Sequence, residues 1–209
     1  MSLRFDLVGS RDLNPDEWRG LQSLSHDAFG EELKNRSPAE IDYLTAWTDP
    51  DRFYESHVHP NSEVGERYNP NQTFARPRVA LALDGNDTIG YGYAADNVSG
   101  NTFERALKLL GTTKKYLWLK EFAVHPEYQR KGIAEHMARV LLMSGSPFQP
   151  MTAYIWPDEI PFLSTPLQKA GFEPTGEQSV KIYGPDSEPV RQVRMLSRSV
   201  GSTVLKLAK

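Results

Sequence analysis

Residues 116–142 read YLWLKEFAVHPEYQRKGIAEHMARVLL, which combines an apolar run, a short loop with one glycine and an amphipathic stretch. The run 116–124 is mostly apolar or aromatic and predicts a buried strand. Pro126 ends the run because proline cannot donate a hydrogen bond to a strand ladder. A helix is predicted to open at 129–134, because apolar residues recur from there at helical spacing, at Ile133, Met137, Val140 and Leu141. The stretch therefore predicts a strand, a loop and a helix in direct succession.

The start of this helix suits a phosphorylated ligand. The first N–H groups of a helix have no intrahelical partner and lie at the positive end of its dipole. Gly132 and the small Ala134 let a ligand approach the backbone closely, and Arg130 and Lys131 add positive charge. The glycine spacing fits neither a Walker loop nor the Gly-x-Gly-x-x-Gly pattern of Rossmann domains. The alternative is an ordinary helix start that contains a glycine.

Three stretches together resemble the GNAT superfamily, the Gcn5-related N-acetyltransferases. The pyrophosphate loop of that family, Gln/Arg-x-x-Gly-x-Gly/Ala, is matched by Gln129, Gly132 and Ala134. Residues 79–95 resemble its central hairpin, with Asp-Gly-Asn-Asp as the turn. Residues 169–172 (KAGF) resemble the end of its last helix. The resemblance implies an α/β (α+β) fold, with a mixed, mostly antiparallel sheet of about seven strands, splayed at the central strands and flanked by about four helices.

The same resemblance implies one N-acetyltransferase domain over residues 1–209, with its core at 3–198 and a surface tail at 199–209. It implies acetyl-CoA as the co-substrate, with the pyrophosphate held by N–H groups of the loop and the pantetheine arm paired with the strand edge beside a bulge. The implied cofactor-binding residues are Phe122, Ala123, Val124, Gln129, Arg130, Lys131, Gly132, Ile133 and Ala134.

A catalytic base is expected on the strand before the loop, where family members often have Glu or His. Attack on a thioester needs a neutral amine, so a nearby group must accept the ammonium proton. Glu121 is the only carboxylate on this strand. Alternation places it on the face opposite Trp118 and Lys120 unless a bulge intervenes. The competing interpretation is that Glu121 pairs with a basic neighbour or caps the bulge.

A general acid is less clear, because Leu167 stands where the family often has a tyrosine that protonates the leaving thiolate. Tyr154 and Ser164 are substitutes, or the thiolate leaves unassisted, which its moderate pKa permits. The resemblance thus implies an acetyl-CoA-dependent transferase that acts by direct attack of a primary amine of a small molecule, peptide or protein. The alternative is a catalytically silent acyl-CoA-binding or regulatory module.

Composition excludes several other classes. The formal net charge of −3 argues against bulk electrostatic binding to nucleic acid or to an anionic membrane. No apolar run has the length of a membrane span, and the first residues lack a signal-peptide pattern. Because the chain has no cysteine, it has no disulfide, thiolate metal site or cysteinyl acyl-enzyme. A cytoplasmic protein is the default expectation. The oligomeric state stays open, with a homodimer as the commonest arrangement.

The remaining predictions concern the surroundings of the site. Helices are expected to begin at Asn14 and at Ser37, the second closed by Asp49-Pro50. A long irregular loop is expected at 55–77, carrying His57 and His59 near the acceptor cleft. These two histidines have no acidic or cysteine partner at clear spacing, so no metal is expected. Acceptor choice is expected to fall to the loops at 30–36 and 184–189, with further walls from the 55–77 loop and an insertion at 96–115.

Overall fold

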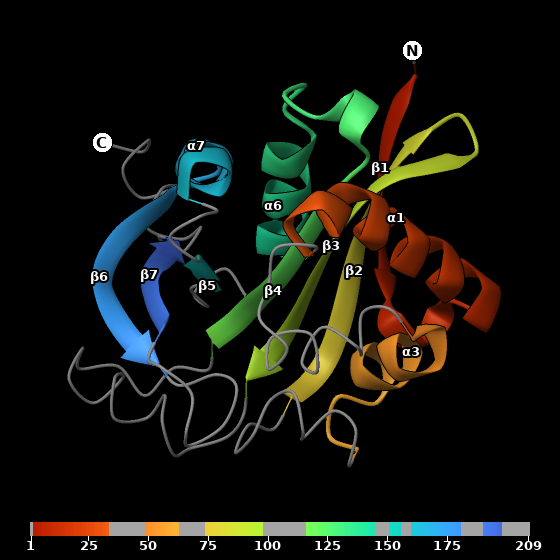
Figure 1. Ribbon diagram of the computed structural model, residues 1–209, viewed down its shortest axis with the longest axis horizontal. Helices are drawn as coiled ribbons and strands as arrows, with labels where there is room; N and C mark the ends of the chain where they lie inside the picture. The colour runs from red at the N-terminus through yellow and green to blue at the C-terminus, as the bar shows by residue number, and fades with distance from the viewer. Residues whose placement is uncertain are drawn as a thin grey trace.

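The structure, a computed structural model, describes residues 2–33, 49–62, 74–97, 116–144, 151–155, 160–180 and 190–197. Seven strands form one sheet in the order β1-β2-β3-β4-β5-β7-β6 (Figure 1). Neighbouring strands are antiparallel except for the parallel pair of β4 and β5. The strands are β1 (Leu3–Gly9), β2 (Phe74–Asp84), β3 (Asp87–Asn97), β4 (Tyr116–Val124), β5 (Met151–Ile155), β6 (Phe172–Val180) and β7 (Val190–Ser197).

Four α-helices of the described residues flank this sheet: α1 (Pro15–Leu33), α3 (Pro50–Val58), α6 (Ile133–Ser144) and α7 (Ile160–Lys169). Short 3₁₀ turns at Ser10–Asp12 and Pro126–Tyr128 precede α1 and α6. Helices α6 and α7 share one buried cluster with the sheet, whereas α1 and α3 share the cluster on the opposite face (Figure 1). The mixed sheet between helices confirms the fold class expected from the sequence. No helix of the described ranges is long and apolar enough to cross a membrane.

Strand β3 shows how the sequence separates these two faces. Residues 90–93 read Gly-Tyr-Gly-Tyr, and alternation along the strand sends the glycines to one face and the tyrosines to the other. A Cβ atom at Gly92 would lie 2.5 Å from the ring of Phe122 and 3.2 Å from Leu141, so only glycine lets α6 pack this closely. The two tyrosine rings are fully buried under α1 and α3.

Helix α1 begins at Pro15, as predicted. The side chain of Asn14 accepts hydrogen bonds from the backbone N–H groups of Asp16 and Glu17, at 2.9 and 3.0 Å. The Glu17 carboxylate accepts in turn from the N–H of Asn14 at 2.7 Å, which completes a capping box. The helix extends to Leu33, so the loop predicted at 30–36 starts within it.

Asp49-Pro50, which were predicted to close a helix, begin α3; the helix they were predicted to close lies outside the described residues. The Asp49 side chain accepts from the N–H groups of Asp51 and Arg52 at 3.0 and 3.3 Å, and Pro50 occupies the first helical position. Proline suits this position, since its missing N–H would have no helical partner there. Residues 55–58 are therefore helical and 74–77 belong to β2, which shortens the predicted 55–77 loop.

Helix α6 begins at Ile133, within the stretch 129–134 that was predicted to open it, and β6 begins at Phe172, with two residues between it and the end of α7. The β2–β3 turn lies at Gly85-Asn86, as predicted. The predicted helix start at 37, most of the 96–115 insertion, the 184–189 loop and the 199–209 tail lie outside the described residues.

Candidate active site

Strands β4 and β5 separate in the middle of the sheet. They pair only from Leu117 to Leu119 on β4, opposite residues 151–153 of β5. Beyond that point β4 continues to Val124 without pairing to β5, and β5–β7 diverge from it (Figure 1). The splay expected at the central strands is therefore present. No strand of the described residues pairs with this open edge of β4, which carries the residues predicted to pair with a pantetheine arm.

A β-bulge lies where the splay begins. On β3, Tyr93 pairs with Glu121 and the next residue, Ala94, pairs with Leu119, so Lys120 is the extra residue. The bulge exchanges the two faces of β4. Leu119 belongs to the cluster under α6, and so does Phe122, three positions later. Glu121 therefore points to the opposite face, toward α1 and α3, where simple alternation from Leu119 would have placed it under α6.

Glu121 is buried, with 7% of its surface exposed, and both carboxylate oxygens have partners. Oε2 lies 3.0 Å from Nε2 of His57. Oε1 accepts hydrogen bonds from the Tyr91 hydroxyl and, at 3.3 Å, from the Ser25 hydroxyl. These partners come from α3, β3 and α1, so the carboxylate joins three elements to β4.

The tyrosines around Glu121 are hydrogen-bond donors. Burial, and secondly the carboxylate of Glu121, raises the pKa of Tyr91 well above its usual value and raises that of Tyr93 as well. Both phenols are therefore neutral near neutral pH. The Tyr93 hydroxyl donates to the carbonyl oxygen of His57 at 2.9 Å.

His57 was expected on an irregular loop, but it lies on α3 and is buried. The His57 ring contacts the aromatic rings of Trp18, Phe53 and Tyr93, whose centroids lie 4.2–5.2 Å from its own. The sequence prediction missed the pair with Glu121 because 64 positions separate the two residues. Reading Asp49-Pro50 as a helix start would have placed His57 one turn after Phe53 on the apolar face of that helix.

His59, by contrast, is exposed and follows the last residue of α3. Among the described residues, no group of three or more His, Asp or Glu side chains is arranged to hold a metal ion.

The loop before α6 has an unusual backbone. Both Arg130 (φ 61°) and Gly132 (φ 80°) occupy the left-handed region. A Cβ at Gly132 would meet only Nδ1 of His136, at 3.9 Å, so the glycine is required for its conformation and not for space. Its carbonyl accepts from the backbone and ring nitrogens of His136, at 3.1 and 3.0 Å.

Backbone N–H groups of residues 130–134 donate none of the hydrogen bonds recorded among the described residues. Two contacts connect the loop to the residues just before it. The Gln129 amide donates to the Val124 carbonyl at 3.2 Å, and the Lys131 ammonium lies 4.8 Å from the centroid of the Tyr128 ring. Residues 129–132 are exposed, whereas Ile133 is buried in the core under the sheet. Of the predicted cofactor-binding residues, Ile133 therefore has only its backbone available.

Leu167, at the position where the family often has tyrosine, is 2% exposed and packs in the cluster with α6. This position therefore contributes to the core. Of the two predicted substitutes for a general acid, Tyr154 lies on β5 and Ser164 on α7.

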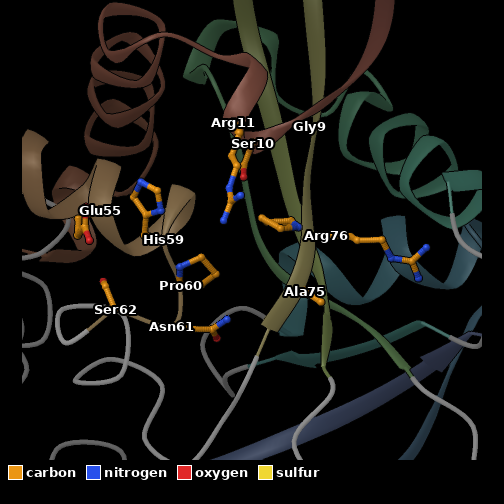
Figure 2. Close-up of a pocket in the computed structure, with 11 residues that line it drawn as sticks. Gly9, Ser10, Arg11, Glu55, His59, Pro60, Asn61, Ser62, Ala75 and Arg76 are labelled. Atoms are coloured by element: carbon orange, nitrogen blue, oxygen red, sulfur yellow. The ribbon is translucent and has the colours of Figure 1, made fainter.

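A separate pocket of about 950 Å³ lies beside α3, lined by residues 9–11, 55, 59–62 and 75–77 (Figure 2). The Arg11 side chain points into it. Glu55 and His59 line it from successive turns at the end of α3, while His57 points to the other side of that helix, toward Glu121. This pocket and the carboxylate thus lie on opposite sides of α3.

Comparisons with known proteins agree with this architecture. Residues 40–144, half of the chain, match the acetyltransferase (GNAT) family. No curated protein matches in sequence.

Among solved structures, the PaiA N-acetyltransferase from Thermoplasma acidophilum in complex with coenzyme A is 13% identical, with a TM-score of 0.53 over 95% of this chain and 99% of that one. A GNAT-family acetyltransferase from Streptococcus agalactiae is 12% identical, with a TM-score of 0.61 over 93% and 94%. NAA60 from Arabidopsis thaliana in complex with acetyl-CoA is 12% identical, with a TM-score of 0.58 over 93% and 97%. At such identities these likenesses show the fold, and the family match completes the assignment: the chain belongs to the GNAT acetyltransferase family.

Proposed function

We propose that this protein is an acetyl-CoA-dependent N-acetyltransferase that transfers the acetyl group to a primary amine by direct attack. The observation that carries the proposal is the open edge of β4, which begins at the bulge and leads to a loop whose N–H groups face no acceptor of the described residues. The coenzyme A and acetyl-CoA complexes of the Thermoplasma and Arabidopsis proteins support the choice of co-substrate.

In this proposal, the backbone N–H groups of residues 130–134 hold the pyrophosphate, assisted by the charges of Arg130 and Lys131. The open backbone of Phe122–Val124 pairs with the pantetheine arm, because those side chains are largely buried and only main-chain groups remain. Acetyl-CoA supplies the thioester carbonyl, and N–H groups of the open edge can stabilise the oxyanion that forms there.

Glu121 is the proposed acceptor of the amine proton, directly or through one water molecule. Its position supports this role, since it follows the bulge immediately and lies where the β4 edge opens. The hydroxyls of Tyr91 and Ser25 favour its ionised form by donating to one carboxylate oxygen.

The acceptor is proposed at the level of a primary amine. A peptide or protein amine is one class to test, since the solved neighbours include the NatC complex bound to Gag peptide and CoA. Thiol release from acetyl-CoA, measured against pools of amino acids, polyamines, aminoglycosides and peptide N-termini, tests turnover. The chain has no cysteine and so adds no background to a thiol-reactive dye.

A matched pair of glycine variants tests the loop. Gly132→Leu and Gly85→Leu strain the backbone similarly, since both glycines have positive φ (80° and 64°) and open space around them. We expect a loss of at least about tenfold in coenzyme A affinity for Gly132→Leu only, measured by calorimetry, because the distorted loop no longer directs its N–H groups at one point. Equal affinities in the two variants would exclude this loop as the binding site.

A catalytically silent acyl-CoA-binding module is the second candidate. It is favoured by Leu167, whose burial in the core leaves no hydroxyl at that position. Acetyl-CoA binding without thiol release in any amine pool would support this second function.

A further inference from the structure

Both ring nitrogens of His57 face hydrogen-bond acceptors inside the protein. Nδ1 lies 2.7 Å from the carbonyl oxygen of Phe53, and Nε2 lies 3.0 Å from Oε2 of Glu121. Because His57 is only 5% exposed, these contacts and not bulk water determine where its protons reside.

Nδ1 of His57 must carry a hydrogen, since a backbone carbonyl can only accept. The Ser56 hydroxyl is consistent with this. It donates to the same Phe53 carbonyl at 3.0 Å, so its own lone pair can face Nδ1, also at 3.0 Å.

A second hydrogen lies between Nε2 and Glu121. Without it, the lone pairs of a nitrogen and a carboxylate oxygen would repel each other at 3.0 Å. That proton belongs to the ring, because the other carboxylate oxygen accepts from the Tyr91 and Ser25 hydroxyls, and two donors stabilise the ionised carboxylate. His57 is therefore an imidazolium paired with a carboxylate.

Polar groups facing this pair come from α1, α3 and β3. They include the Ser25 hydroxyl, the Phe53 carbonyl, the Ser56 hydroxyl and the hydroxyls of Tyr91 and Tyr93. The two phenols stay neutral because burial raises their pKa. Among the described residues, the ion pair recorded for Glu121 is the one with His57.

We propose that His57 is a positioning residue for the acetyl transfer: its imidazolium keeps Glu121 ionised and fixes the direction of the carboxylate. The inference rests on the proposed function, in which Glu121 accepts the amine proton. A buried carboxylate without a cationic partner tends to take up a proton. Once protonated, it can no longer act as the base.

The proposed step balances without a proton from His57. The amine nitrogen forms a bond to the acetyl carbon, the carbon–sulfur bond breaks, and the electron pair leaves with the thiolate. The proton of the amine passes to Glu121. His57 acts only through Glu121 and contacts neither reactant.

The protonation state is measured on the wild-type protein by ¹⁵N–¹H NMR of its five histidine rings, with pH as the variable. We expect both ring nitrogens of His57 to carry a hydrogen near neutral pH, because each faces an acceptor. A His57 ring with a hydrogen on only one nitrogen would overturn the inference. This readout needs no turnover, so it fails or succeeds independently of the proposed function.

The catalytic consequence is tested with His57→Gln, which can still donate to the carboxylate but carries no charge, and with His59→Gln as the matched control. We expect the acidic limb of the kcat profile to move to higher pH in His57→Gln, because the carboxylate loses its cationic partner. The KM for acetyl-CoA should be unchanged, and the limb should not move in His59→Gln. An unmoved limb in a folded His57→Gln protein, checked by circular dichroism, overturns the positioning role. If Glu121→Gln is fully active, Glu121 is not the base and His57 has no positioning role. The acetyltransferase function would still be supported by turnover of the wild-type protein.

Discussion

Among the side chains that the structure describes, each face of the sheet buries one carboxylate, and the two have different partners. Asp96, on the α6 face, is 1% exposed and binds the guanidinium groups of Arg76 (2.6 Å) and Arg78 (3.0 Å). Glu121, on the α1/α3 face, binds a histidine and two hydroxyls. Arginine stays charged at any ordinary pH, whereas histidine changes its charge near neutrality.

The partners of Asp96 therefore keep their charge at any ordinary pH. Arg78 also donates to the carbonyl oxygen of Ser144, at 3.0 Å, and so joins β2 and β3 to the end of α6. Burial lowers the pKa of Arg78 and Asp96 opposes that effect, but the guanidinium remains protonated. The comparison teaches that buried carboxylates on the two faces have partners of fixed and of changeable charge, and we propose that the first serves stability and the second proton transfer.

The largest expected effect separates the two carboxylates by activity. Glu121→Gln should lower kcat by about 10²–10⁴-fold, because the acceptor of the amine proton is lost. Asp96→Asn should leave kcat within a few-fold, since its cluster lies on the other face. Steady-state thiol release measures both. A comparable loss of kcat in the two variants would remove the distinction drawn here.

Stability tests the Asp96 cluster separately. Asp96→Asn leaves the side chain of Arg78, which is 12% exposed, without a full negative partner. Removing one member of a buried pair destabilises a protein by about 3–5 kcal/mol. Urea unfolding gives the free energy, with the exposed pair Arg19–Asp16 as a control, where Asp16→Asn should change it by no more than about 1 kcal/mol. A decrease of less than about 1 kcal/mol in the free energy of unfolding of Asp96→Asn would show that the protein does not depend on this ion pair.

Packing on the α6 face can be tested on the glycines of β3. Gly92→Ala places a methyl group 2.5 Å from the buried Phe122 ring, and overpacking of this kind destabilises by about 1–3 kcal/mol. Gly90→Ala is the matched control, because its nearest atoms lie at 3.1–3.4 Å. We expect a lower urea midpoint for Gly92→Ala than for Gly90→Ala, and equal midpoints would contradict the close approach of α6.

The α1/α3 face should be the one sensitive to alkaline pH. The pKa of Tyr91 and Tyr93 is raised in the folded protein above the value of 10.0 that applies when unfolded. The native state therefore holds protons that the unfolded state loses, and stability is complete below about pH 10 and falls above it. The slope should be about 1.4 kcal/mol per pH unit for each tyrosine. Tyr93→Phe should reduce this slope in urea unfolding between about pH 10 and 11, and an unchanged slope would contradict the assignment.

Local patterns were enough to predict much of the fold. The strand at 116–124, the turn at Gly85-Asn86 and the start of α1 at Pro15 all have the positions expected, since apolar periodicity, turn residues and caps act over a few neighbouring positions. Asp49-Pro50 shows the limit of such patterns. An acidic residue before proline can follow one helix and can also begin the next, and the hydrogen bonds to Asp51 and Arg52 show that a helix begins here.

The sequence by itself determined the family resemblance, the strand–loop–helix unit and Glu121 as the carboxylate on its strand, because these depend on residues close together in the chain. Only the tertiary structure decided which partners Glu121 has there. The bulge at Lys120 turns it to the α1/α3 face, and folding brings His57 to it across 64 positions. Such contacts between distant residues leave no periodic signal in the sequence, since they arise from the pairing register of β3 with β4 and from the packing of α3 on the sheet.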